Sequence, residues 1–124
     1  MEQKKPAIDE MLKMMAQELG ETPITMESLA KLNEKMVYEH AANKQFAMSG
    51  DKIPPKYKLL ISLGISAALG VENCIETYTK VALKQGMSPE EIMEVIILAR
   101  FVKGTTVIST STGAMQLIID QLNK

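Results

Sequence analysis

The residue with the most distinctive chemistry in this sequence is Cys74, the only cysteine of the chain. We expect Cys74 in the first turn of a helix that follows Gly70, where unpaired N–H groups and the helix dipole favour a thiolate nucleophile. Tyr78 is four residues further on, so both side chains should share one face of that helix. Two observations oppose a reactive thiol: an isolated intracellular cysteine is commonly a buried core residue, and Glu72 brings a negative charge close in sequence.

A reactive Cys74 would have to work without a second cysteine in the same chain. No intramolecular disulfide and no cysteine-only metal site can form. A sulfenic acid on Cys74 would be resolved by an external thiol, or by Cys74 of another subunit. The sequence therefore predicts a one-cysteine mechanism if Cys74 is catalytic.

His40 is the only histidine of the chain and the other candidate for proton transfer. We place it on a helix that ends near residue 49. Such a histidine is most often a surface or packing residue, and the alternative is that it reaches the Cys74 pocket as a base. With one histidine and one cysteine, we expect no metal site and no cofactor. Glu90 and Glu91 are explained by helix capping.

Composition limits the classes of partner. The chain has 124 residues, a formal net charge of −1 and 46% hydrophobic residues, so it lacks the basic surface of a nucleic-acid-binding protein. Its longest uncharged apolar stretch, residues 59–71, is too short to span a bilayer. No apolar signal-peptide core follows Met1. We expect a cytoplasmic protein that binds neither nucleic acid nor a membrane.

The elements that must position these residues are helices. Apolar residues recur at helical spacing, and glycine, proline and Ser/Thr mark the ends. The patterns predict helices over 6–19, from a Thr25 N-cap to 49, over 56–69, 71–85 and 89–103, and from about 106 to 122. The helix over 56–69 should be the buried centre of the fold, with Gly64 permitting a close helix crossing. Ser88-Pro89-Glu90-Glu91 is typical of an N-cap with a capping box.

The last helix overlaps a β-branched stretch, Thr105–Thr112, which favours a strand on propensity alone. A lone strand would have no partner in a helical chain. We therefore interpret this stretch as part of a helix whose hydroxyl groups bond back to the helix backbone. The predicted fold is all-α, with about five to six helices in a single domain over residues 1–124.

Several short motifs follow one another along residues 53–117. They are Ile53-Pro54-Pro55-Lys56, Ser66-Ala67-Ala68-Leu69-Gly70 before Cys74, Ala82-Leu83, and Gly86-Met87-Ser88-Pro89-Glu90-Glu91-Ile92. This set resembles the carboxymuconolactone decarboxylase/AhpD-like (alkylhydroperoxidase-like) family. The resemblance implies a helical bundle that assembles as trimers or hexamers. AhpD-like members reduce peroxides or disulfides with a Cys-x-x-Cys pair, supported by a glutamate and a histidine.

The resemblance carries only part of that site onto this chain. It places Cys74 on the second cysteine of the pair. Val71 occupies the position of the first cysteine, Tyr78 that of the histidine and Leu59 that of the glutamate. Three of the four positions therefore hold residues that cannot perform the same thiol or proton chemistry. The decarboxylases proper lack the cysteine pair but keep a histidine at the position of Tyr78.

Together with Cys74, the resemblance implies a thiol-dependent, peroxiredoxin-like antioxidant peroxidase or a disulfide oxidoreductase that uses Cys74, with Tyr78 and His40 as candidate partners. Its small-molecule substrate would be a peroxide, thiol or disulfide. One alternative is a family member that lost the catalytic relay and acts as an oligomeric binding protein. A weaker one is a lactone decarboxylase using Lys80, Arg100 and His40. We also expect Cys74 to be partly or wholly enclosed near the N-terminus of its helix, with Tyr78 beside it.

The chain should also assemble with copies of itself. The predicted helices 56–69 and 89–103 are apolar nearly all round, and large apolar patches are rare on soluble monomers. The excess should be buried between subunits. With the family resemblance, this predicts an obligate homo-oligomer, either a trimer or a hexamer.

Overall fold

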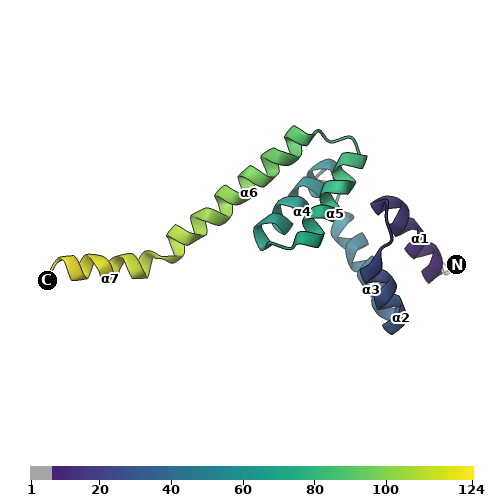
Figure 1. Cartoon of the computed structure of the whole chain (residues 1–124), viewed down its shortest axis with the longest axis horizontal. Helices are drawn as coiled ribbons and strands as arrows, with labels where there is room; N and C mark the ends of the chain where they lie inside the picture. The colour runs from purple at the N-terminus through teal and green to yellow at the C-terminus, as the bar shows by residue number, and fades with distance from the viewer. Residues whose placement is uncertain (1–6) are drawn as a thin grey trace. The chain divides into compact units, whose positions relative to one another are not determined.

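The computed structural model describes residues 7–124, and within this range the chain is helical without strands (Figure 1). The predicted all-α class is thus confirmed, although the described residues form seven helices where five to six were expected. They are α1 (Ile8–Leu19), α2 (Ile24–Leu32), α3 (Glu34–Met48), α4 (Pro55–Leu69), α5 (Glu72–Lys84), α6 (Pro89–Thr110) and α7 (Thr112–Leu122).

The chain divides into two compact units. The first contains the described residues up to Lys58, with α1, α2, α3 and the start of α4, and the second is Leu59–Lys124. The single domain expected over residues 1–124 stays a prediction.

In the first unit, the predicted helix from Thr25 to residue 49 is wrong, because the chain forms two helices there. Asn33 has an extended backbone, with φ −161° and ψ 94°, and it ends α2. Its side-chain oxygen accepts a hydrogen bond from the Met36 N–H at 3.2 Å, so the same residue caps α3. The start also differs, since α2 begins at Ile24 after Pro23 and Thr25 lies inside the helix.

The first helix ends as predicted. Gly20 adopts the left-handed conformation, with φ 75°, and its N–H bonds to the Ala16 carbonyl. The predicted start at Pro6 lies outside the described residues. Met11 on α1 and Val37 on α3 are buried apolar residues of this unit.

Lys58 donates hydrogen bonds to the segment that connects α3 and α4. Lys58 Nζ donates to the Met48 carbonyl at 2.8 Å and also to the Gly50 carbonyl. These carbonyls belong to the C-terminal end of α3 and the residues just after it, where helix geometry leaves acceptors without an intrahelical donor. One cation therefore satisfies two backbone acceptors of the connection.

The core of the second unit is built from α4, α5, the turn after α5 and the start of α6. Its buried members are Leu59, Leu63, Val81, Ala82, Met87 and Ile92. Only one face of α4 enters this core, since Ile61, Ile65 and Leu69 on its other side are exposed. The expectation that this helix is the buried centre of the fold is therefore wrong for half of its surface in the single chain.

Two glycines set the turns on either side of α5. Gly70 (φ 72°) and Gly86 (φ 88°) are both left-handed. In the first turn, the Val71 N–H bonds to the Ser66 carbonyl and the Gly70 N–H to the Ala67 carbonyl. This is the Schellman pattern, which needs a residue without a Cβ penalty at the glycine position.

The N-terminus of α6 has the predicted capping box. The Glu91 N–H donates to Ser88 Oγ and the Ser88 N–H donates to Glu91 Oε1, both at 3.1 Å. Pro89 occupies the first helical position. The N-cap Ser88, the capping-box Glu91 and the proline at the first helical position were all expected from the sequence.

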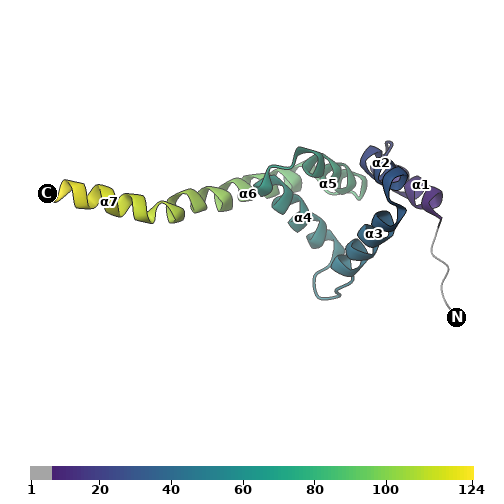
Figure 2. The same cartoon turned by 90° about the horizontal axis from the view of Figure 1, so that it is seen from below.

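The predicted end of this helix at Gly104 is wrong, because α6 continues to Thr110 and is interrupted at Ser111, where α7 follows. Gly104 does not adopt the left-handed conformation that ends a helix. The hydroxyls of Thr105, Thr106, Ser109, Thr110, Ser111 and Thr112 donate to carbonyls three or four residues earlier, as predicted. In both views the end of α6 and α7 extend beyond α4 and α5 (Figures 1 and 2).

Candidate functional site

Cys74 lies in the first turn of α5, two residues after its start at Glu72. The first N–H groups of an α-helix have no intrahelical acceptor, and they point toward the helix N-terminus. The thiol therefore lies near the unpaired N–H groups at the N-terminus of α5, as the sequence predicted. Cys74 is exposed, however. The expectation of an enclosed thiol is wrong for the single chain.

This position follows from the turn between α4 and α5. The left-handed Gly70 reverses the chain, and Val71 has an extended backbone and begins α5 without a side-chain cap. The first intrahelical bond of α5 is donated by the Ile75 N–H to the Val71 carbonyl, at 3.0 Å. Since no side chain caps this end, its N–H groups remain available to an anion or a thiolate.

Tyr78 is on α5, one turn after Cys74, but its ring has a structural role. It is partly buried and packs against the hydrophobic core of the second unit. Side chains four residues apart on a helix have Cβ atoms about 5–6 Å apart. Tyr78 is thus a neighbour of Cys74 on the same helix, held in place by the core.

The chemical surroundings of the thiol on α5 and the preceding turn are acidic and apolar. Glu72 and Glu76 lie two residues to either side of Cys74, and both are exposed. Leu69 and Val71, just before the helix, are exposed apolar side chains. Such surroundings disfavour an anionic substrate and favour a neutral one with apolar groups.

His40 lies on α3 in the first unit and is exposed. Cys74 and Tyr78 belong to the second unit. The structure thus brings Cys74 and Tyr78 onto one helix, and the role of His40 as a base stays a prediction.

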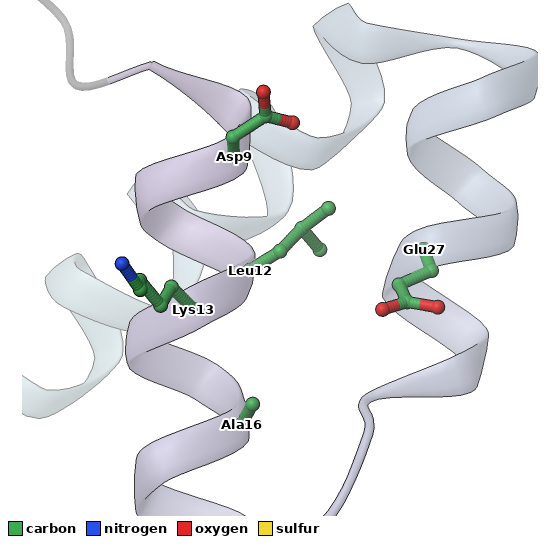
Figure 3. A pocket seen from close by; sticks show the side chains of 5 residues that line it. All are labelled: Asp9, Leu12, Lys13, Ala16 and Glu27. Carbon is green, nitrogen blue, oxygen red and sulfur yellow. The ribbon is translucent and has the colours of Figure 1, made fainter.

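Two shallow hollows lie in the first unit. One, of about 400 Å³, is between α1 and α2 and is lined by Asp9, Leu12, Lys13, Ala16 and Glu27. Figure 3 shows Leu12 pointing from α1 toward α2 between the two helices. The second, of about 550 Å³, is lined by Met11, Lys35, Tyr38, Glu39, Ala41, Ala42 and Gln45. No predicted site residue lines either hollow, and no sequence motif marks them.

Residues 7–124 contain neither a cluster of metal-ligating side chains nor a helix that could span a membrane. In this range no group of three or more His, Cys, Asp or Glu side chains is placed to hold a metal ion. None of the helices described has both the length and the hydropathy that crossing a bilayer requires.

The comparisons with known proteins address the family. A search among curated proteins finds no significant match. A family model described as the carboxymuconolactone decarboxylase family matches residues 36–116, which includes His40, Cys74 and Tyr78. This match covers more than half of the chain and starts earlier than the motifs of residues 53–117. The chain therefore belongs to the carboxymuconolactone decarboxylase family.

Proposed function

We propose that this chain is a thiol-dependent oxidoreductase that reduces a hydroperoxide, with Cys74 as the nucleophile. The observation that supports the proposal best is the position of this thiol. It is exposed in the first turn of α5, whose first N–H groups have neither an intrahelical acceptor nor a side-chain cap. The family resemblance gives the same position to a redox-active cysteine.

The reaction begins with attack of the Cys74 thiolate on one oxygen of the hydroperoxide. The O–O bond breaks, the alcohol leaves with a proton, and Cys74 becomes a sulfenic acid. An external thiol then attacks the sulfur and releases water, which leaves a mixed disulfide. A second external thiol displaces Cys74 and forms the disulfide product. One hydroperoxide is reduced to an alcohol and water, and two thiols are oxidised.

The surroundings of Cys74 favour one class of hydroperoxide. Glu72 and Glu76 make an anionic substrate unfavourable, while the exposed Leu69 and Val71 offer an apolar surface. We therefore propose a neutral organic hydroperoxide. Tyr78 cannot replace the family's histidine as a base, but its hydroxyl is the proposed proton donor to the leaving alkoxide, since the side chain is one turn from Cys74 on α5.

The test is hydroperoxide consumption by the purified chain with a monothiol or dithiol reductant. We expect turnover with the unmodified protein and none with Cys74→Ser, which leaves no thiol in the chain. Tyr78→Phe keeps the ring in the core and removes the hydroxyl, and it should lower the rate roughly 100-fold or more as a lost proton donor. If the unmodified protein reduces no hydroperoxide with any thiol donor, the proposal is wrong.

A second candidate is a binding protein without catalysis. It is supported by the residues that replace the family relay, Val71, Tyr78 and Leu59, and by the exposed apolar faces of α4 and α6. This candidate predicts no peroxide turnover and no sulfenic acid on Cys74 after exposure to peroxide. Mass spectrometry of the peroxide-treated protein, trapped with a sulfenic-acid reagent, separates the two. Lactone decarboxylation, the third prediction, has no further support.

A further inference from the structure

The helices α6 and α7 share a row of residues at alternating spacings of four and three, which we call the arm seam. Its members are Ile97, Phe101, Gly104, Ile108, Ser111, Met115, Ile118 and Leu122. Spacing of this kind places side chains on one side of each helix, as in a coiled coil, with Ser111 between the two helices. The six large apolar members are 42% to 77% exposed. The seam lies away from the core-facing residues Ile92 and Ala99 of α6, which are buried.

The seam has two small positions at its centre, Gly104 and Ser111. A glycine inside a helix lowers helix propensity, and it usually allows something to approach the backbone closely. A Cβ added at Gly104 would have no atom within 4 Å in the single chain. The packing of the chain itself therefore gives no reason for a glycine there.

We propose that two copies of this chain pair through the arm seam, with the two arms antiparallel. In the register that we infer, Ile108 lies opposite Ser111 of the second copy and Gly104 lies opposite its Met115. At the ends, Phe101 lies opposite Ile118 and Ile97 opposite Leu122. Each central layer thus combines a large side chain with a small one, as close packing requires.

The residues beside the seam match in the same register. Leu98 lies opposite Ile119, and Val107 opposite Ala114, so apolar residues meet apolar ones. Thr105 meets Thr112, and hydroxyl groups meet on that side. The interruption at Ser111, where φ is −93° and ψ is 5°, falls at the centre of the pairing. Both copies therefore bend at the same place, and the Met115 N–H keeps its helical bond to the Ser111 carbonyl at 2.9 Å.

A parallel arrangement would not pack as well. It would place Gly104 against Gly104 and Ser111 against Ser111, which leaves two layers underfilled. It would also place Phe101 against Phe101. Underfilled layers lose contact energy with no compensating gain, so the pattern of sizes selects the antiparallel arrangement.

The occupant of the seam is a second copy because the seam complements itself. Residues 104–119 contain no charged side chain, so this stretch has no charge pattern with which to select a different partner, and the charged residues of the arm, Arg100, Lys103 and Asp120, lie toward its two ends. Residues 97–122 extend about 38 Å as helix. Covering their exposed apolar side chains would bury on the order of 800 Å² per copy, the size of a standard stable interface. A hexamer contains such two-fold pairs, whereas a trimer alone does not.

The first experiment compares two glycines of the arm by measuring dimer dissociation with analytical ultracentrifugation of the full chain. Gly104→Leu should clash with Met115 of the second copy and raise the dissociation constant roughly tenfold or more. Gly113→Leu is the matched control, since Gly113 is also a helical glycine with open space around it but lies outside the seam. It should leave the dissociation constant nearly unchanged. Adding Met115→Ala to Gly104→Leu should restore pairing.

A second experiment tests the orientation by disulfide formation in the Cys74→Ser background. Chains that carry Ile108→Cys are mixed with chains that carry Ser111→Cys, and the mixture is oxidised. The antiparallel register predicts a disulfide between the two different variants as the main product. A parallel pair would instead join two identical chains, so each variant would crosslink when oxidised alone. A monomeric protein, an equal loss of pairing in both glycine variants, or disulfides only between identical positions would each overturn the proposal.

Discussion

Gly64 on α4 faces Val95 on α6 so closely that a Cβ added to the glycine would lie 3.5 Å from Val95 Cγ1. This distance is an ordinary van der Waals contact. We therefore expect Gly64→Ala to stabilise the fold by up to about 1 kcal/mol, because alanine restores helix propensity without a clash. A leucine at this position has no room and should cost about 1–3 kcal/mol. Urea unfolding of both variants measures the difference, and a strongly destabilised Gly64→Ala would contradict the observed spacing.

The capping box of α6 gives a second prediction. Ser88→Ala removes the acceptor of the Glu91 N–H, and Glu91→Ala removes the reciprocal acceptor. Each change should lower the free energy of unfolding by about 1 kcal/mol. The double variant should cost less than the sum, because the two bonds support one conformation. Glu90→Ala is the control, since this exposed neighbour interacts with the same helix dipole but takes no part in the box. An equal cost for Glu90→Ala would show that charge alone matters.

These features of α6 and the turns at Gly70 and Gly86 could be predicted because the interactions that create them are local. A left-handed glycine and a capping box depend on residues within one turn of the chain. The break at Asn33 is also local, since asparagine favours helix caps, but no glycine or proline accompanies it to mark the break. Gly104 shows the converse: glycine ends a helix only where the backbone turns left-handed, and α6 continues through Gly104 to Thr110 without such a turn.

The candidate site was predictable only in part. The position of Cys74 in the first turn of α5 follows from Gly70, which is a local signal. Its exposure depends on which side chains from elsewhere cover it, and the spacing of residues in α5 does not contain that information. Tyr78 illustrates the same limit, because helical spacing places it one turn from Cys74 but does not indicate that its ring packs against the core.

The lysine between α3 and α4 gives a third prediction. Lys58→Met keeps most of the aliphatic stem but removes the donor to the Met48 and Gly50 carbonyls. We expect a loss of about 1–2 kcal/mol, because hydrogen bonds from a charged group exceed the average bond in strength. Lys52→Met is the matched control. Its ion pair with Asp51 is at 3.8 Å between highly exposed side chains, so its loss should be close to neutral. Thermal unfolding of the two variants distinguishes a specific bond from a general effect of charge.

The last prediction concerns access to Cys74. The thiol is exposed in the single chain, and so iodoacetamide should alkylate it in the folded protein at a rate within about tenfold of that in urea. Ser66→Cys in the Cys74→Ser background is the control, because Ser66 is buried and a cysteine there is nearly isosteric. That thiol should be protected until the chain unfolds.

Alkylation is best followed by mass spectrometry at several protein concentrations, since assembly could cover the site. A thiol that is open at low concentration and protected at high concentration would place Cys74 at a contact between subunits. One that is protected at every concentration would contradict its exposure on the chain.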